Sequence, residues 1–195
     1  MSTYTIPNVV ARDARGERIL DVYSHLLTER VIYVGSAIDA GVANALTAQL
    51  LHLDATANDR DIQLYINCEG GDPAAALGVY DTMRFVRSDV ATTCVGQAVG
   101  VGAVLLAAGA AGKRSMLPHA RAVLHQPADQ GRGTIPDLIV RADELLRVRG
   151  DLEQILHTHT GQDVETLRRD TDTDRVLNAQ AAVAYGLVDA VVAER

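Results

Sequence analysis

The sequence predicts an α/β fold in a single domain. Short apolar runs that suit buried strands alternate along the chain with longer segments in which apolar residues recur at helical spacing. The chain has 195 residues, about the size of one ordinary domain, and no linker, repeat or break in composition divides it. Hydrophobic residues make up 48% and charged residues 22%, which excludes a disordered chain, a coiled coil and a collagen-like repeat. We therefore expect one domain over residues 1–195.

The first half of the chain predicts two strand–helix pairs. Residues 31–35 form an apolar run, and Asp39 can cap a helix that follows it. Residues 62–66 predict a second strand, which ends in a glycine turn. Asp72 can cap the next helix and Pro73 takes its first position, where a missing N–H costs little. The expected apolar faces are Val42, Leu46, Leu50 and Leu53 in the first helix, and Ala76, Tyr80, Met83 and Val86 in the second.

The second half predicts two more strands and two helices. A strand over residues 90–95 leads through a glycine-rich turn into a helix around Leu105, and residues 121–124 predict another strand. A long helix is expected over residues 134–160, where Gly161 can end it. Its narrow apolar stripe fits either an ordinary surface helix or a helix that packs on a partner subunit. The stripe consists of Leu138, Ala142, Leu145, Leu146, Leu152, Ile155 and Leu156.

Composition favours an intracellular, cytoplasmic protein. The net charge of -7 has the wrong sign for a protein that binds nucleic acid or an anionic membrane. Cys68 and Cys94 are too few for a disulfide framework, and residues 1–7 show no signal segment. Residues 91–112 carry no charge, but glycines and Gln97 interrupt them. A buried strand, a turn and a buried helix explain this stretch better than a membrane span.

Three segments that could bind a cofactor or a metal lack the residue spacing that such binding motifs require. Residues 109–115 resemble a phosphate-binding loop, but its first glycine would fall on Ala107 and its hydroxyl on Arg114. His157 and His159 are two residues apart, so on a helix they point to different faces. The two cysteines lack the paired spacing of a zinc site. We predict neither a metal nor a cofactor.

Three strand ends carry residues that suit acyl-transfer chemistry. Gly70 and Gly71 form a turn whose bare backbone can present amide N–H groups to a developing oxyanion. Residues 96–103 form a strand-to-helix turn, where serine hydrolases place their nucleophile, although the G-x-S-x-G form is absent. His125 follows an apolar strand. Taken singly, each feature also has a structural explanation, because glycines serve turns and histidines cap strand ends.

Short motifs recur in a fixed order along nearly the whole chain. They are Arg15-Gly16-Glu17-Arg18, Asp21-Val22-Tyr23-Ser24, Leu64-Tyr65-Ile66-Asn67, Tyr80-Asp81-Thr82-Met83, Gly112-Lys113-Arg114, His125-Gln126-Pro127, Thr160-Gly161-Gln162, Asp170-Thr171 and Tyr185-Gly186-Leu187-Val188-Asp189. This order and spacing resemble the ClpP family, the proteolytic subunits of the Clp protease. The resemblance implies a ClpP/crotonase-type superhelix of repeated strand-strand-helix units. Residues 1–20 would form an axial segment and residues 128–160 a protruding handle.

The resemblance also implies partners. Family members stack as two heptameric rings around a proteolytic chamber, and AAA+ unfoldases feed it. We therefore expect other ClpP-like subunits, in homo- or hetero-heptameric rings stacked as a tetradecamer, and an AAA+ Clp unfoldase. In this sequence, the positions that correspond to the family's unfoldase-docking groove are Gln63, Tyr65, Phe85, Thr93, Ser115 and Leu117. The family's groove is aromatic and aliphatic, so the polar residues Gln63, Thr93 and Ser115 predict weak or indirect docking.

Carried over residue by residue, the catalytic machinery lacks its nucleophile. The family's histidine falls on His125, its aspartate on Asp174, and its oxyanion amides on Gly71 and Val101. The family's serine falls on Gly100, and covalent acyl transfer needs an oxygen or sulfur nucleophile. The sequence thus predicts a catalytically inert, ClpR-like subunit with a structural or regulatory role in protein degradation and quality control by a mixed Clp core.

Two other functions compete with this interpretation. The chain would be a working or weak ATP-dependent serine-type peptidase if Cys68, in the oxyanion turn, brought its sulfur near His125 as a surrogate nucleophile. A crotonase-like site for a coenzyme A thioester is the other alternative, but nothing basic or adenine-specific supports it. Thr173 replaces the arginine that resembles an inter-ring switch in the family, which puts ring-to-ring coupling in question.

Overall fold

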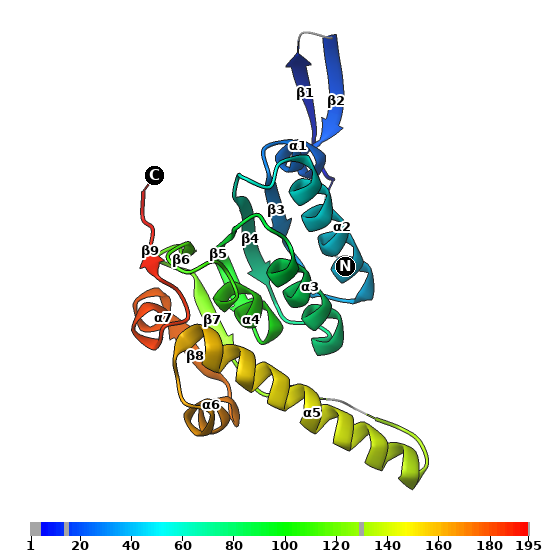
Figure 1. The fold of residues 1–195 in the computed structure, drawn as a ribbon, viewed down its shortest axis with the longest axis vertical. Coiled ribbons are helices and arrows are strands. Elements are labelled where there is room, and N and C mark those ends of the chain that lie inside the picture. Colours follow the sequence, from blue (N-terminus) through cyan, green and yellow to red (C-terminus); the bar gives the residue numbers. More distant parts are fainter. Residues whose placement is uncertain (1–4, 14–15, 129–130, 195) are drawn as a thin grey trace.

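The chain folds into a sheet with helices packed against it, and two elements project from this body. The computed structural model describes residues 5–13, 16–128 and 131–194. Figure 1 shows the hairpin of β1 (Asn8–Asp13) and β2 (Gly16–Asp21) at one end and helix α5 (Ile135–Thr160) extending beyond the sheet at the other. The mixed α/β architecture agrees with the predicted fold class.

Within the described residues the main sheet has seven strands. They are β3 (Val31–Val34), β4 (Ile62–Cys68), β5 (Val90–Val99), β6 (Arg114–Met116), β7 (Arg121–Leu124), β8 (Arg175–Asn178) and β9 (Ala190–Val191). Strands β3, β4, β5, β6 and β9 neighbour one another in that order and run parallel. Residues 92–94 of β5 pair with β6, and residues 97–99 of β5 pair with β7. The sheet therefore divides into two branches at β5. Strand β8 then pairs antiparallel with β7.

Local capping explains where the helices begin and end. Asp39 accepts a hydrogen bond from the Val42 amide at 2.8 Å, and Asp72 accepts one from the Ala74 amide at 3.0 Å. Gly161 ends the longest helix with a φ of +72°. The other helices are α1 (Val22–Thr28), α2 (Ala40–Thr56), α3 (Pro73–Phe85), α4 (Val101–Ala107), α6 (Val164–Thr171) and α7 (Ala179–Tyr185). The caps at Asp39, Asp72 and Gly161 confirm the predicted helix boundaries.

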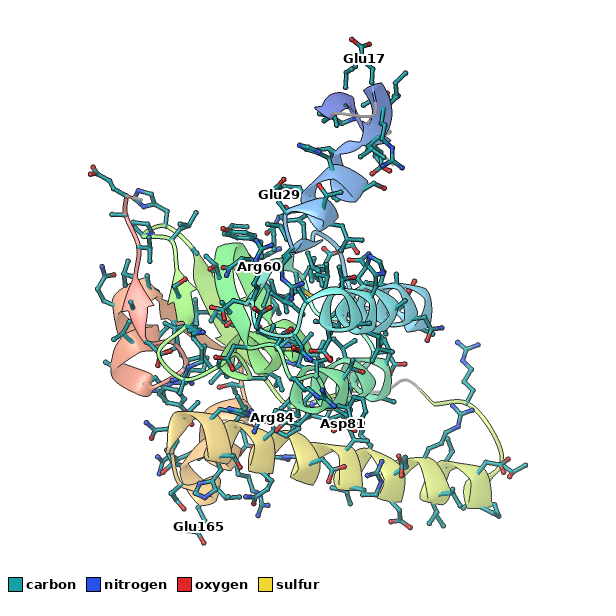
Figure 2. All side chains as sticks on the ribbon, turned by 45° about the horizontal axis from the view of Figure 1, so that its top comes forward. Glu17, Glu29, Arg60, Asp81, Arg84 and Glu165 are labelled. Atoms are coloured by element: carbon teal, nitrogen blue, oxygen red, sulfur yellow. The ribbon has the colours of Figure 1, made fainter. Side chains whose placement is uncertain are left out.

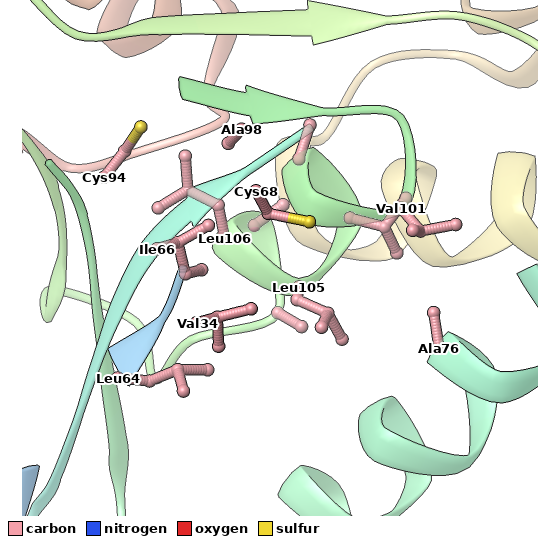
Figure 3. Close-up of a cluster of buried hydrophobic side chains, with 14 of the residues drawn as sticks. Val34, Leu64, Ile66, Cys68, Ala76, Cys94, Ala98, Val101, Leu105 and Leu106 are labelled. Carbon is pink, nitrogen blue, oxygen red and sulfur yellow. The ribbon is translucent and has the colours of Figure 1, made fainter. Parts of the chain in front are cut away.

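The core lies between the sheet and its helices, with α4 buried along its whole length. Figure 3 shows part of this core, where side chains of β4 and β5 face Leu105 and Leu106 of α4. Charged side chains such as Arg60 and Glu165 lie on the exterior, as Figure 2 shows. No helix in the described ranges has the length and apolar character needed to span a membrane. The uncharged stretch 91–112 instead forms β5, a tight turn and α4.

Two predicted strands are longer than their sequence patterns indicated. The strand expected over residues 62–66 continues to Cys68, and the one expected over residues 90–95 continues to Val99. The extension of β5 follows from pairing with β7, a strand that lies far along the chain. Gly96 also helps, because a Cβ there would collide with the Asn67 side chain, which accepts a hydrogen bond from the Gln97 amide. The glycine-rich turn therefore begins at Gly100 and not at Gly96.

The two projecting segments expose apolar surface. Of the predicted axial segment, residues 1–4 and 14–15 lie outside the described residues, and Ile19 in the hairpin is 72% exposed. Of the predicted handle, residues 129–130 lie outside the described residues. The first half of α5 leaves Ile135, Ile139 and Val140 exposed, whereas Leu152 and Leu156 near its end are buried. Among the described residues, the buried side chains of this helix thus all lie in its C-terminal half.

Candidate active site

Three neighbouring strands end at one edge of the sheet and bring the predicted site residues together. Strands β4, β5 and β7 run parallel, so the segments that follow them meet at the same edge. A cavity of about 160 Å³ lies there, and Gly71, Gly100, Val101 and His125 all line it. Four of the five predicted catalytic positions therefore share one cavity. The fifth, Asp174, does not line it.

Two residues that line this cavity, Gly71 and Val101, have main-chain amides without an acceptor. The N–H groups of Gly71 and Val101 donate no hydrogen bond to any group in the described part of the chain. Gly71 has a φ of +143°, and a Cβ there would lie 2.5 Å from the Ile38 amide nitrogen, so only glycine fits this close backbone approach. Free amides held rigidly in this way can stabilise a developing oxyanion.

Gly100 has the backbone conformation of a nucleophile elbow without the nucleophile. It forms the N-cap of α4 with a φ of +52° and a ψ of −113°, and its amide donates to the Val123 carbonyl at 2.8 Å. Serine hydrolases hold their nucleophile on such a sharp strand-to-helix turn, at a cost in backbone strain. Glycine adopts a positive φ without that cost. The turn therefore persists although no side chain projects from it.

The His125 ring fills the place where a side chain on residue 100 would begin. A Cβ built on Gly100 would lie 2.6 Å from His125 Nε2 and 2.8 Å from Cε1. His125 Nδ1 lies 2.9 Å from the Gln126 carbonyl oxygen. A carbonyl oxygen only accepts, so Nδ1 carries the hydrogen and donates it. In the neutral ring, Nε2 then holds a lone pair that faces Gly100 and the cavity.

Asp174 follows His125 in the antiparallel register of β7 and β8, in which Leu124 pairs with Arg175, but its side chain does not bond to His125. Its side chain is exposed, and no hydrogen bond or ion pair joins it to His125 within residues 16–128 and 131–194. The Gln126 carbonyl orients the imidazole instead. The neighbour Arg175 pairs with Asp170 at 2.7 Å and lies over the Tyr185 ring. The structure thus assembles the oxyanion groups and the histidine but not the histidine–aspartate pair.

A polar network connects the C-terminal half of α5 to the loop that carries His125. The Arg149 guanidinium donates to Glu153 at 2.8 Å, to the Gln126 side chain at 2.7 Å and to Asp172 at 2.9 Å. Glu153 is only 3% exposed and also pairs with Arg168 at 2.9 Å. Sequence reasoning missed this network. The i, i+4 spacing of Arg149 and Glu153 signals an ion pair on a helix, but the partners on other elements leave no local signal.

Cys68 does not line the cavity. Its side chain is fully buried, and its thiol donates to the Gly70 carbonyl at 3.2 Å. Figure 3 shows the sulfur directed toward α4, where it packs against Gly102. Burial raises the pKa of the Cys68 thiol, so the reactive thiolate is disfavoured. The sulfur that the sequence offered as a surrogate nucleophile is absent from the cavity lining.

The other predicted site, the docking groove, is also formed in part. A groove of about 620 Å³ crosses one face of strands β3 to β6 and is lined by five of the six predicted residues. Phe85 is not among them and lies 79% exposed at the end of α3. The hydroxyls of Thr93 and Ser115 are 2.9 Å apart and hydrogen-bond to each other. Leu26, Tyr33 and Val192 also line the groove, and sequence reasoning did not identify them.

The two histidines near the end of α5 are engaged within the fold. His157 Nδ1 lies 2.7 Å from the Gln162 carbonyl oxygen, and His159 Nε2 lies 3.2 Å from the Tyr80 hydroxyl. Burial lowers the pKa of His159. In the described ranges no group of three or more histidine, cysteine, aspartate or glutamate side chains is arranged to hold a metal ion.

The chain is similar to known proteins over almost its full length. The sequence model of the family described as Clp protease matches residues 14–195. The chain is 63% identical over 196 residues to the ATP-dependent Clp protease proteolytic subunit 1 of Nocardia farcinica, and the match covers 100% of both chains. It is 55% identical to proteolytic subunit 4 of Rhodococcus jostii, covering 99% of this chain and 100% of the relative. It is 51% identical to proteolytic subunit 2 of Streptomyces avermitilis, covering 100% and 98%.

Proposed function

The chain belongs to the Clp protease family, and we propose that it is a ClpP-type subunit that shapes a Clp proteolytic core without cleaving peptide bonds itself. One observation carries the proposal. The residue that faces His125 and the free amides of Gly71 and Val101 is Gly100, which has no side chain. Peptide hydrolysis by this family's serine chemistry needs a hydroxyl at that point, beside the base.

The surroundings of His125 support the same proposal. In a serine triad a carboxylate holds the imidazole in the correct tautomer and stabilises the imidazolium that forms during the reaction. The neutral Gln126 carbonyl occupies this place, and Asp174 is exposed. A carbonyl fixes the tautomer but offers no negative charge to the imidazolium. The site is therefore unsuited to peptide hydrolysis in two respects, the nucleophile and the counter-charge.

The exposed half of α5 supports a role in assembly. Ile135, Ile139 and Val140 are 75%, 57% and 68% exposed, and Leu146 is 64% exposed. Soluble monomers rarely leave a large contiguous apolar surface uncovered. We propose that other ClpP-like subunits cover this surface in homo- or hetero-heptameric rings, and that an AAA+ unfoldase binds weakly or indirectly. Both cysteines are free thiols, which suits the reducing cytoplasm that we propose as its location.

Assembly is tested by native mass spectrometry of the chain, alone and with a catalytic paralogue. We expect ring-sized particles in at least one of the two samples. Substitution of the exposed Val140 by Asp should shift them toward smaller species, because it places a charge on the apolar surface. A stable monomer in both samples at micromolar concentrations would contradict the assembly role.

Catalytic silence is tested in the same mixed core. The nucleophilic serine of the paralogue is replaced by alanine, so that only this chain can act on a fluorogenic peptide. We expect peptide cleavage no faster than in buffer alone. The core that contains the unaltered paralogue should cleave the peptide. Turnover that disappears on His125→Ala or Cys68→Ala in this chain would overturn the proposal.

A further inference from the structure

We infer that His125 itself stands in the place of the missing nucleophile and can accept the acyl group of an activated ester. The inference concerns ester chemistry on the imidazole and goes beyond the proposed role in a Clp core. It rests on the position of the ring, the state of its two nitrogens and the two free amides beside it.

The position of the ring carries the argument. His125 Nε2 lies 2.6 Å from the point where a Cβ on Gly100 would be, so the imidazole occupies space that a nucleophilic side chain would otherwise fill. Gly71, Gly100, Val101 and His125 line the same cavity. A carbonyl carbon bound where its oxygen reaches the amides of Gly71 and Val101 thus faces a ring nitrogen and not a hydroxyl.

The hydrogen bonding of the ring leaves that nitrogen reactive. Nδ1 donates to the Gln126 carbonyl at 2.9 Å, which fixes the neutral tautomer with the lone pair on Nε2. In a serine triad this lone pair takes a proton from the hydroxyl. Without a hydroxyl at Gly100, the lone pair is directed into the cavity. Histidine is one of the side chains that form covalent intermediates in enzymes.

The reaction balances without a cofactor. The Nε2 lone pair forms a bond to the ester carbonyl carbon, and the carbonyl electron pair moves to oxygen, where the Gly71 and Val101 amides stabilise it. Collapse breaks the bond to the leaving oxygen, which departs as a phenolate, and Nδ1 releases its proton to solvent. Water then attacks the acyl-imidazole, yielding the carboxylic acid and restoring the imidazole. The net reaction is ester plus water to acid plus phenol.

Activated esters are the appropriate substrate class because the site lacks a general acid. An amine must be protonated as it leaves, and in a serine triad the histidine supplies that proton. Here the same imidazole would be bonded to the acyl carbon. The other titratable groups that line the cavity, Arg149 and Glu153, are paired with each other. A phenolate leaves without a proton, so aryl esters react where peptides do not.

The cavity walls indicate a short apolar acyl group. Beyond the polar groups, the lining includes Val104, Leu124, Leu152 and Leu156. These side chains offer an apolar surface to the acyl chain and no donor or acceptor. A butyryl group suits these walls better than a charged one, and p-nitrophenyl butyrate combines this acyl group with a phenolate that is released visibly.

The experiment measures p-nitrophenolate release and the mass of the intact protein. We expect release from p-nitrophenyl butyrate at least ~10²-fold faster than with an equal concentration of free imidazole, the effect of about one preorganised oxyanion donor. Peptide mapping after an acid quench should locate a butyryl group on His125. His125→Gln should abolish both signals. The control His119→Ala should change neither, because His119 is exposed and does not line the cavity.

A second variant tests the position of the ring. Gly100→Ala places a methyl group 2.6 Å from Nε2, closer than two such atoms can pack, so the ring must move from the cavity position. The rate should then fall to that of free imidazole while the melting curve shows a folded protein. Equal rates for the wild type and His125→Gln would overturn the inference, and so would butyrylation confined to other histidines. Turnover that depends on His125 without any acyl adduct would also overturn it, in favour of water attack. Peptides are not used here, so failure of this test leaves the proposed function standing.

Discussion

The cavity beside Gly100 and the groove across β3 to β6 differ in the groups that form them. Main-chain amides, a glycine elbow and the ends of three strands shape the cavity. Side chains shape the groove, where the Thr93 and Ser115 hydroxyls bond to each other. The turn at Gly100 and the close approach of Gly71 to Ile38 do not need a side chain on residue 100, whereas the surface of the groove depends directly on its side chains. The backbone of the cavity can therefore form without the nucleophile.

The largest effect should come from disturbing the backbone of the cavity. Gly71→Ala brings a Cβ into the Ile38 backbone, which cannot move aside as a flexible side chain can. We expect the free energy of unfolding to fall by more than ~4 kcal/mol, the range of severe packing and strain defects. Gly70→Ala is the matched control. Gly70 also has a positive φ, but its added Cβ would meet nothing closer than 3.9 Å, so only strain of ~1–3 kcal/mol is expected.

Urea denaturation of both variants measures this difference. Equal destabilisation of Gly70→Ala and Gly71→Ala would show that the close approach of Gly71 to Ile38 does not constrain the cavity. The contrast with the groove would then lose its basis.

A somewhat smaller effect should follow from the one buried carboxylate that lines the cavity. Glu153→Ala removes a buried carboxylate from Arg149, whose side chain is 21% exposed, and from Arg168, whose side chain is 58% exposed. Arg149 keeps Gln126 and Asp172, so we expect a loss of ~1–3 kcal/mol in unfolding free energy. Glu144→Ala removes an exposed ion pair with Arg147 on the same helix and should cost less than ~1 kcal/mol. If thermal and urea unfolding place both variants within error of each other, the Glu153 network does not support the cavity.

The smallest effect concerns the groove. The double variant Thr93→Val with Ser115→Val replaces the hydroxyl pair by three methyl groups, each worth up to ~0.8 kcal/mol when buried by an apolar ligand. We expect the affinity for an apolar unfoldase-loop peptide, weaker than ~1 μM in the wild type, to rise about tenfold. Thr56→Val, on the exposed face of α2, should leave it unchanged. Calorimetry that finds submicromolar binding to the wild type would remove the claim of a weakened groove.

Local signals in the sequence predicted much of the fold but less of the site. Asp39, Asp72 and Gly161 act on their own helices, so their boundaries could be predicted from neighbouring residues. The extension of β5 to Val99 depends on β7, more than twenty residues away, and periodicity within a short window does not contain it. Cys68 is different, because its burial could have been predicted. The alternation through Ile62, Leu64 and Ile66 continues to it, but the predicted strand ended at residue 66.

The lack of a side-chain bond between Asp174 and His125 could not be predicted from the sequence. A motif match fixes which residues correspond to a family's triad, but not whether their side chains meet. The segments around both residues are held by Arg149, which binds Gln126 and Asp172, and by the Arg175–Asp170 pair. These contacts join α5, the loop after β7 and the segment after α6, and their geometry is set only in the folded chain.

The central claim, that the site is complete in its backbone and lacks a hydroxyl, is tested most directly by labelling Gly100→Ser with a fluorophosphonate. Intact mass spectrometry and peptide mapping should find a stable adduct on residue 100, and none on Gly100→Ala. Peptide turnover should stay well below that of a catalytic ClpP, because the new Cβ crowds Nε2 at 2.6 Å, residue 100 has a φ of +52° and no carboxylate holds His125. A folded, assembled Gly100→Ser protein that takes no label would contradict the claim.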